Sequence, residues 1–449
     1  MGRLFGTDGV RGVANETLTC EMAFDIGRAA AFTLLDDFND HPDILIGKDT
    51  RISSDMLECA LAAGICSVGA NAVLLGPIPT PAVAYLVRLY GARAGFVISA
   101  SHNPVEFNGI KVFNSQGFKL ADEIEERVES YILENRHEIK LQTGAAIGTV
   151  KRRESAVDEY VAHIIESTQA NLSGLRVVFD CANGAAAISA HKLFAALGAE
   201  CIMTANAPDG VNINDGVGST HLEHLRSEVE ANGADIGIAF DGDADRCLAV
   251  DEKGGELDGD KIIAVFAKYL KAQGRLQGDT AVVTVMTNLG FMDFCKKYGI
   301  KSVRTAVGDR YVLEEMLRHG YNLGGEQSGH VILSDWSTTG DGQLTAALLL
   351  DILRRSGLPA SELAAEVGHY PQIHINVRTT DEGKARFKKD EELEGYIEAA
   401  QQELFDSGRV LVRVSGTEPL IRIMVEGRDQ EKIRDVAQDL ESKVRERTS

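Results

Sequence analysis

Strand-like and helix-like segments alternate along most of this chain, and the alternation begins afresh three times. The first round contains the runs DILIGKDT, AVLLGPIPT and GFVISAS, with helical patterns at 56–68 and 124–135. The second round opens on LRVVFDCANG and the third on TAVVTVMTN. Short apolar runs that alternate with amphipathic helices are typical of a parallel or mixed sheet with helices on both faces. We therefore expect three similar mixed-sheet α/β domains.

The pattern changes near residue 369. From there the chain reads as a strand (HINVRT), a long charged helix, two paired runs (RVLVRVSG and LIRIMVEG) and a terminal helix, which together predict a smaller α+β domain. The expected fold class is α/β, with four domains in series around a central cleft, where a ligand site is expected. We place the domains at residues 1–150, 151–255, 256–368 and 369–449.

Composition limits the partners of the chain. Its 46 Lys and Arg against 67 Asp and Glu give a formal net charge of -21, which argues against a broad basic surface for nucleic acid or anionic lipid. Apolar runs are interrupted by charge before the ~20 residues that cross a bilayer, and the N-terminal stretch has no apolar segment. The seven cysteines show no CxxC spacing, which fits a reducing compartment. We expect a cytoplasmic protein without nucleic-acid or membrane partners.

The first candidate for chemistry is Ser101, in the polar stretch SASHNP that follows the apolar run 95–99. Ser, Asn and Pro are common in turns, so a structural turn is one interpretation. The other is a nucleophile or phosphate carrier, because α/β proteins place reactive groups at the carboxyl ends of strands. A hydrolase pair with His102 is disfavoured, since adjacent side chains diverge and a base must reach the hydroxyl. Ser101 therefore needs another activator.

The second candidate is the stretch DGDADR, which places Asp241, Asp243 and Asp245 on alternate residues after a strand-like run. The small residues between them let the chain curl, so that three like charges converge where only a cation relieves their repulsion. Hard oxygen ligands favour Mg²⁺ or Ca²⁺ over zinc. An EF-hand is excluded because Arg246 stands where that loop requires glycine. A solvated acidic turn is the structural alternative.

These two candidates complete each other. Three carboxylates leave open positions on an octahedral Mg²⁺ ion, and phosphate oxygens commonly fill such positions. A phosphate on Ser101 would supply that ligand and would make the serine a phosphoryl donor rather than a hydrolytic nucleophile. Lys111 in NGIKVF is expected to serve as a cation or acid–base partner at the same strand end, with a solvated edge lysine as the alternative.

Three glycine-containing stretches are candidates for binding a sugar phosphate. GEQSGH carries Glu326, Ser328 and His330 on a loop suited to sugar hydroxyls or an amine, with a structural turn as the alternative. FGTDGVRG adds the cation Arg11. RVSGTEPLIR predicts a phosphate cradle of arginines, hydroxyls and loop N–H groups. The residues of this cradle are Arg413, Ser415, Gly416, Thr417 and Arg422.

SASHNP, DGDADR, GEQSGH and SGTEPLIR, in this order and spacing, resemble the α-D-phosphohexomutase superfamily over essentially the whole chain. FGTDGVRG and the GDRYV run at 308–312 resemble its bacterial branch that acts on glucosamine phosphate. One departure is Val414, where many members have proline, and the resemblance implies that this loosens the phosphate loop slightly.

The resemblance implies a role for each motif. It implies a phosphoserine at Ser101 in the first domain, one Mg²⁺ per subunit at the metal loop of the second, and a sugar-recognition loop in the third. The implied metal ligands are Ser101, Asp241, Asp243 and Asp245. The implied catalytic residues are Ser101, His102, Lys111, Arg246 and Arg11. The implied substrate-binding residues are Glu326, Ser328, His330, Arg310, Arg413, Ser415, Gly416, Thr417 and Arg422.

By the same resemblance the chain is an intramolecular phosphotransferase that converts glucosamine 6-phosphate to glucosamine 1-phosphate through a 1,6-bisphosphate, which also serves as activator. The resemblance implies that its product feeds UDP-N-acetylglucosamine and cell-wall synthesis. The expected small-molecule partner is a hexosamine phosphate, and a homodimer is the expected assembly. The alternative within the superfamily is the same chemistry on glucose or mannose phosphate. A metal-dependent phosphatase and a sugar-phosphate sensor are alternatives from other classes, but neither requires all four motifs.

Overall fold

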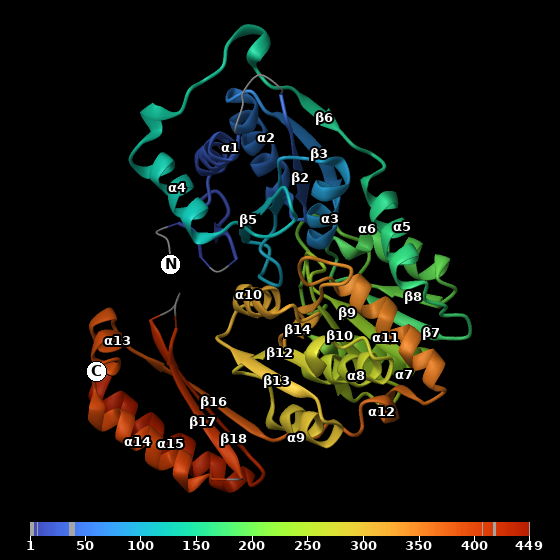
Figure 1. The fold of residues 1–449 in the computed structure, drawn as a ribbon, viewed down its shortest axis with the longest axis vertical. Helices are drawn as coiled ribbons and strands as arrows, with labels where there is room; N and C mark the ends of the chain where they lie inside the picture. Colours follow the sequence, from blue (N-terminus) through green and yellow to red (C-terminus); the bar gives the residue numbers. More distant parts are fainter. Residues whose placement is uncertain (1–3, 7, 36–40, 406, 416–418, 449) are drawn as a thin grey trace. The chain divides into compact units, whose positions relative to one another are not determined.

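The computed structural model describes residues 4–6, 8–35, 41–405, 407–415 and 419–448. Its internal contacts divide the chain into two compact units, residues 1–286 with 299–365 and residues 287–298 with 366–449. The first unit contains three sheets with their helices and the second contains one (Figure 1). Among the described residues, no helix is both long and apolar enough to cross a membrane.

The first sheet has six strands in the order β1-β5-β4-β2-β3-β6. Strands β2, β3, β4 and β6 run parallel, whereas β5 runs antiparallel to both of its neighbours, so the sheet is mixed. The strands are β1 (Val10–Val13), β2 (Asp43–Lys48), β3 (Asn71–Pro77), β4 (Ala94–Ile98), β5 (Phe107–Asn114) and β6 (Val150–Arg152). The helices are α1 (Cys20–Leu34), α2 (Ile52–Ser67), α3 (Thr80–Tyr90), α4 (Asp122–Leu133), η1 (Arg136–Glu138) and η2 (Gly144–Ala146).

Helices cover both faces of this sheet, as side-chain alternation along its strands requires. Ile46 of β2 and Phe96 of β4 lie in one core with residues of α1 and α2. The adjacent Gly47 and Gly95 face the other way, and a Cβ atom at either would lie within 2.7 Å of the Val83 side chain on α3. Helix α3 thus packs directly on the backbone of the face opposite α1 and α2.

The second sheet has the order β11-β10-β9-β7-β8, with β7, β8 and β9 parallel and β10 antiparallel to β9. Its strands are β7 (Arg176–Asp180), β8 (Glu200–Thr204), β9 (Ile236–Phe240), β10 (Cys247–Asp251) and β11 (Glu256–Leu257). Its helices are α5 (Ala156–Thr168), α6 (Ala186–Ala196) and α7 (Leu222–Asn232). The tight connection from β9 to β10 contains the three alternate aspartates.

The third sheet has the order β13-β12-β14-β15. Its strands are β12 (Thr280–Thr284), β13 (Lys301–Thr305), β14 (Leu323–Gly325) and β15 (Val331–Leu333). The helices of this part are α8 (Gly259–Ala272), η3 (Gln277–Asp279), α10 (Asp309–His319), α11 (Gly342–Ser356) and α12 (Ala360–Leu363). The antiparallel turn from β14 to β15 presents the GEQSGH stretch.

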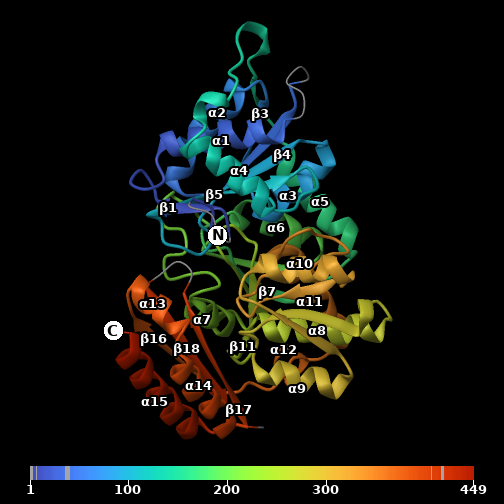
Figure 2. The ribbon, with the colours of Figure 1, turned by 60° about the vertical axis from the view of Figure 1, so that its left-hand side comes forward.

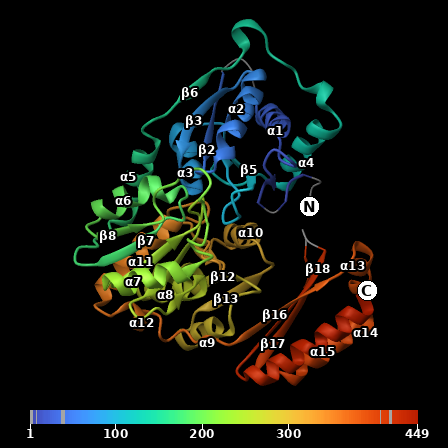
Figure 3. The ribbon, with the colours of Figure 1, turned by 180° about the vertical axis from the view of Figure 1, so that it is seen from behind.

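In the second unit the order β16-β18-β17 is antiparallel throughout. Helices α14 and α15 lie on one face of this sheet (Figures 2 and 3), where Ile421 and Ile423 form a core with Ile433 and Leu440. The elements are α9 (Leu289–Tyr298), β16 (Gln372–Arg378), α13 (Asp381–Phe387), α14 (Glu391–Glu403), β17 (Gly408–Val414), β18 (Leu420–Gly427) and α15 (Gln430–Thr448).

The α/β class with an α+β C-terminal part is confirmed, whereas the four domain boundaries and the central cleft stay predictions. Two element predictions were wrong. The single long charged helix expected after β16 is two helices, because Asp390 caps α14 by accepting a hydrogen bond from the Leu393 N–H. Helix α2 begins at Ile52, four residues earlier than predicted from its apolar pattern.

A buried polar pair links α5 to α11 inside the first unit. The Tyr160 hydroxyl, fully buried, donates a hydrogen bond of 2.7 Å to Asp341 Oδ1. Asp341 also caps α11 by accepting from the Leu344 N–H at 2.9 Å. Burial raises the pKa of Asp341 to about 6, and the Tyr160 hydrogen bond opposes this rise.

We predict that Tyr160→Phe lowers the free energy of unfolding by about 1 to 3 kcal/mol. The loss should be larger at about pH 7.5 than at about pH 5, because the hydroxyl stabilises the ionised Asp341, which predominates in the folded protein only above about pH 6. Because the folded-state pKa of Asp341 is raised, its contribution to the free energy of unfolding falls as pH rises from 3.8 to about 6 in the wild type. In the variant this contribution falls further, because the loss of the hydroxyl raises the folded-state pKa of Asp341 again. Urea denaturation at both pH values measures the loss, with Tyr311→Phe at a 41% exposed site as control. An equal loss at both pH values would contradict this account.

Candidate active site

Ser101 lies in the connection that follows β4, at the carboxyl edge of the first sheet. It is 1% exposed and has a left-handed backbone with φ of 54°. Its hydroxyl donates a hydrogen bond of 2.5 Å to Asp241 Oδ2. The His102 Nδ1 atom lies 3.4 Å from the same hydroxyl, so the expectation that these adjacent side chains diverge was wrong.

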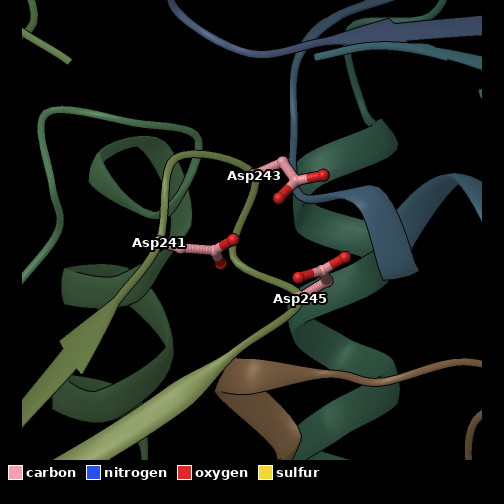
Figure 4. A group of neighbouring side chains, drawn as sticks. All are labelled: Asp241, Asp243 and Asp245. Carbon is pink, nitrogen blue, oxygen red and sulfur yellow. The ribbon is translucent and has the colours of Figure 1, made fainter. Parts of the chain in front are cut away.

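The three aspartates of the β9–β10 connection form a compact, buried group. One carboxylate oxygen from each of Asp241, Asp243 and Asp245 lies within 4.8 Å of the others, and the carboxylates converge as Figure 4 shows. Burial, and then repulsion by its two neighbours, holds the pKa of Asp241 well above its ordinary value. Asp243 Oδ1 and Asp245 Oδ1 are buried and accept no hydrogen bond from any described residue. Buried carboxylate oxygens left in this state suit a hard divalent cation.

The metal loop lies directly against the serine loop. A Cβ atom on Gly242 would lie 2.5 Å from the Ser101 carbonyl oxygen, so only glycine fits between the two loops. Thr80, at the start of α3, also holds the metal loop. Its N–H donates to the Asp243 carbonyl at 2.9 Å and its hydroxyl to Asp243 Oδ2 at 2.7 Å. The first and second sheets are thereby joined at the candidate metal site.

Lys111 supplies the positive charge nearest to these aspartates. It is 1% exposed, and its Nζ lies 2.8 Å from Asp243 Oδ2 and 3.3 Å from Asp245 Oδ2. The alternative of a solvated edge lysine is therefore wrong. The predicted place at a strand end is also wrong, because Lys111 lies within β5 opposite Val97. Burial disfavours its charge, but Asp243, Asp8 and Asp245 outweigh burial and hold the pKa of Lys111 well above its ordinary value.

Two arginines border the aspartate group. The Arg246 N–H donates to Asp241 Oδ1 at 3.1 Å, and its guanidinium Nε lies 3.9 Å from Asp241 Oδ2 and 3.8 Å from Asp245 Oδ1. Arg11 forms an ion pair with Asp8. Burial, and then Arg246 and Arg11, lowers the pKa of His102 to about 4, so its imidazole is neutral near pH 7.

The GEQSGH loop meets the aspartates through His330. The Gly340 N–H lies 3.1 Å from His330 Nε2, and His330 Nδ1 lies 3.6 Å from Asp245 Oδ2. Glu326 Oε1 accepts from the Gly308 N–H at 3.1 Å, and burial raises the pKa of Glu326. The Ser328 hydroxyl is buried and has no hydrogen-bond partner among the described residues. Two polar groups of this loop thus remain available for a ligand.

Arg310 is not joined to this group. Its guanidinium donates to the Leu120 carbonyl at 2.6 Å and to Glu125 Oε2 at 3.4 Å, and it forms an ion pair with Asp122. These contacts tie α10 to α4 and to Leu120, two residues before α4. A substrate-binding role for Arg310 stays a prediction.

Three residues that the sequence analysis did not select extend the cluster. Lys119 Nζ forms ion pairs with Asp8 and, at 2.5 Å, with Asp309 Oδ2, while Asp309 lies 3.5 Å from His330 Nε2. Asp8 also lies 3.1 Å from Lys111 Nζ. Asp8 and Asp309 belong to the glycine-containing stretches FGTDGVRG and GDRYV, so their positions in the sequence could have marked them as site residues. Lys119 lies in QGFKL, which has no feature that indicates a site.

The second unit contains the predicted phosphate cradle. Arg413 of β17 and Arg422 of β18 are directly paired across the hairpin. Burial, and then Arg422, lowers the pKa of Arg413, and like charges in this position destabilise a sheet unless an anion compensates. The Ser415 N–H donates to the Leu420 carbonyl at 2.9 Å at the base of the loop. Gly416 and Thr417 lie outside the described residues.

Four family models match successive parts of the chain. Residues 2–138, 158–255 and 258–370 match the alpha/beta/alpha domains I, II and III of phosphoglucomutase/phosphomannomutase, and residues 375–443 match its C-terminal domain. Among solved structures, a phosphoglucomutase/phosphomannomutase family protein from Burkholderia thailandensis is 25% identical with a TM-score of 0.82, over 99% of this chain and 97% of that one. The N-acetylphosphoglucosamine mutase of Aspergillus fumigatus, solved with GlcNAc-6P and magnesium, has the same fold at 17% identity and a TM-score of 0.70, over 100% of this chain and 96% of that one.

Curated relatives match the chain from end to end. A phosphoglucosamine mutase of Acetivibrio thermocellus is 53% identical over 447 residues, and one of Clostridium novyi is 51% identical over 449 residues, each covering 100% of both chains. Identity of this size over the full length shows the family as well as the fold. The chain belongs to the phosphoglucomutase/phosphomannomutase family, among the phosphoglucosamine mutases.

Proposed function

We propose that this chain interconverts glucosamine 6-phosphate and glucosamine 1-phosphate through a phosphoryl group carried on Ser101. The observation that carries the proposal is the Ser101 hydroxyl, which donates a 2.5 Å hydrogen bond into a buried group of three aspartates. A buried serine beside a cation site is suited to exchange a phosphoryl group rather than to attack a carbonyl. The full-length similarity to phosphoglucosamine mutases supports the choice of sugar.

The proposed reaction has two balanced halves. In the first, the bond between phosphorus and Ser101 Oγ breaks while a bond forms to the free hydroxyl oxygen at C1 of glucosamine 6-phosphate. That hydroxyl loses a proton and Ser101 Oγ gains one, which leaves free serine and the 1,6-bisphosphate. In the second half, the bond between phosphorus and the oxygen at C6 breaks while a bond forms to Ser101 Oγ. Ser101 Oγ loses its proton, the oxygen at C6 gains one, and glucosamine 1-phosphate remains. The neutral His102 imidazole, with Nδ1 3.4 Å from Ser101 Oγ, is placed to move this proton.

The aspartate group suits one Mg²⁺ per subunit, held by Asp241, Asp243 and Asp245 together with a phosphate oxygen on Ser101. When bound, the ion supplies charge neutralisation for the phosphoryl group in transit. A related enzyme of known structure contains magnesium, and another structure of that enzyme contains glucose 1,6-bisphosphate, which supports a sugar 1,6-bisphosphate as activator here. Lys111, Arg246 and Arg11 surround the same position and would stabilise the negative oxygens of that group.

The sugar would lie against the GEQSGH loop. The half-buried Glu326 carboxylate and the Ser328 hydroxyl are the polar groups of this loop suited to contact the sugar. A carboxylate favours the ammonium of glucosamine over the hydroxyl of glucose. In the second unit, Arg413, Ser415, Gly416, Thr417 and Arg422 would hold the phosphate that is not reacting. The paired arginines support this assignment, because an anion relieves their repulsion.

The cellular setting follows from the same proposal. We place the protein in the cytoplasm, where its substrate and its seven free thiols are compatible with reducing conditions. Its product would supply UDP-N-acetylglucosamine and cell-wall synthesis. A homodimer stays a prediction.

A comparison of sugars tests the proposed function. We expect the highest kcat/KM for glucosamine 6-phosphate among the 6-phosphates of glucosamine, glucose and mannose, at equal bisphosphate activator. Glu326→Gln should lower the preference for glucosamine over glucose by roughly tenfold, because it removes a charge without changing the size of the side chain. Ser101→Ala should lose turnover of all three sugars. A higher kcat/KM for glucose or mannose phosphate would overturn the sugar assignment, and turnover by Ser101→Ala would overturn the phosphoserine.

Removal of the metal tests the aspartate site. Chelation should abolish phosphoryl transfer, and Asp243→Asn should weaken Mg²⁺ binding in calorimetry together with activity, since it removes one of three converging charges. Asp251→Asn is the matched control, because Asp251 is also buried, at 8% exposure against 0% for Asp243, but lies at the far end of β10. Full activity in metal-free buffer, or unchanged Mg²⁺ affinity in Asp243→Asn, would exclude the site.

The phosphate cradle is tested in the second unit. Arg422→Ala should raise KM by roughly ten- to a hundredfold, because one charge-assisted contact contributes about 1.5 to 3 kcal/mol. Arg434→Ala, on the exposed face of α15, should leave the kinetics unchanged. Kinetics of Arg422→Ala that match the wild type would count against the cradle.

A further inference from the structure

Arg51 is an arginine without any exposed side-chain surface, placed between β2 and α2. Its Nε lies 2.8 Å from Asp49 Oδ2, and both side chains of this pair are 0% exposed. A fully buried arginine is rare because removing the charge from water is costly. Neither Arg51 nor Asp49 contributes to the cluster of aspartates and lysines described above, so their burial needs another explanation.

The remaining N–H groups of Arg51 all point into the loop that carries Ser101. They donate to the carbonyl oxygens of Ser101 at 3.0 Å, Asn103 at 2.8 Å and Phe107 at 3.0 Å, and also to that of Pro104. One planar guanidinium thus fixes four carbonyls along seven residues. The fork of donors on arginine suits this role, whereas the three donors of lysine cannot reproduce it.

Asn214 holds the same loop from the second sheet's side. Its Nδ2 donates to the carbonyl oxygens of Ser101 at 2.9 Å and Asn103 at 3.1 Å, which are two of the carbonyls that Arg51 also binds. Asn214 has a left-handed backbone with φ of 58°, which asparagine tolerates, and its N–H donates to the Ala182 carbonyl at 2.9 Å. Each of the two shared carbonyls therefore has both of its lone pairs occupied.

The N–H side of Ser101 is fixed as well. The Ser101 N–H donates to Ser99 Oγ at 2.9 Å, and the Ser99 hydroxyl donates to Asp49 Oδ2 at 2.6 Å, the same oxygen that Arg51 binds. Asp49 Oδ1 accepts in addition from the Arg51 N–H and the Ser54 hydroxyl, both at 3.0 Å. The backbone of Ser101 is thus held at both its N–H and its carbonyl.

We propose that Arg51 and Asn214 are positioning residues that hold Ser101 in register with the metal loop for phosphoryl transfer. The inference rests on the proposed function, in which one serine oxygen must meet two different hydroxyls of one sugar. Such a transfer needs the reacting atoms in line, and a misplacement of about 1 Å costs on the order of a hundredfold in rate. Neither side chain touches the reacting atoms, so each acts through the loop.

The test uses the full-length enzyme and separates rate from binding. Arg51→Lys and Asn214→Ala should lower kcat by roughly a hundredfold and tenfold respectively, with KM for glucosamine 6-phosphate changed by less than about threefold. Transfer from phosphorylated enzyme in a single turnover should slow by the same factors. Arg51→Ala should regain activity with millimolar guanidinium but not with sodium chloride at equal ionic strength. If Arg51→Ala does not fold, the kcat values of Arg51→Lys and Asn214→Ala decide the test.

Asn71→Ala is the matched control. Asn71 is also buried, and its Nδ2 likewise bridges two oxygens, the His41 carbonyl at 2.6 Å and Asp43 Oδ1 at 3.0 Å, but at the opposite edge of the same sheet. It should lower stability and leave kcat unchanged. Folded Arg51→Lys and Asn214→Ala with wild-type kcat, or an equal loss in Asn71→Ala, would overturn the inference. A wild-type enzyme that acquires no phosphoserine on incubation with the sugar 1,6-bisphosphate would instead overturn the proposed function.

Discussion

Mutual repulsion among three buried carboxylates is the constraint on which the rest of this site depends. Asp241, Asp243 and Asp245 bring one oxygen each within 4.8 Å of the others in a region where water contributes little screening. Lys111 of β5 partly neutralises this negative charge, and Thr80 and Ser101 donate hydrogen bonds to the carboxylates. Lys111 lies on β5 of the first sheet, and Thr80 and Ser101 lie in α3 and in the connection after β4, which pack with that sheet. The charge of the second sheet's loop therefore also holds these two parts of the first unit together.

The compensation continues into the third sheet. Lys111 contacts Asp8, Asp8 contacts Lys119, and Lys119 contacts Asp309, which lies beside His330. Positive and negative groups alternate along this path, so that removal of one group would leave its neighbours buried without a counterion. Intact buried ion pairs contribute little net stability, whereas removal of one partner is strongly destabilising. The SASHNP, DGDADR and GEQSGH stretches are thereby held close together within the first unit.

Much of this arrangement follows from one rule of sequence interpretation, that reactive groups sit at the carboxyl ends of strands. The rule selected Ser101 and the three aspartates, which the structure brings into contact. It did not select Arg51, which follows β2 at the same edge, because Asp-Thr-Arg after a strand also reads as an ordinary turn. Lys111 was predicted to lie at a strand end, because the sequence does not show whether the next strand runs parallel or antiparallel. Strand β5 runs antiparallel to β4, and this pairing places Lys111 opposite Val97. Asn214 and Lys119 had no local signal, since their partners belong to other parts of the chain.

The central claim is that the phosphoryl group moves between Ser101 and the sugar without passing to water. The most direct measurement loads Ser101 with a radiolabelled phosphoryl group, mixes the enzyme with glucosamine 6-phosphate for a single turnover, and follows the label after quenching. The account predicts that the label leaves the protein and appears in the sugar bisphosphate and monophosphates. Label released as inorganic phosphate, or retained on Ser101 while the sugar isomerises, would contradict it.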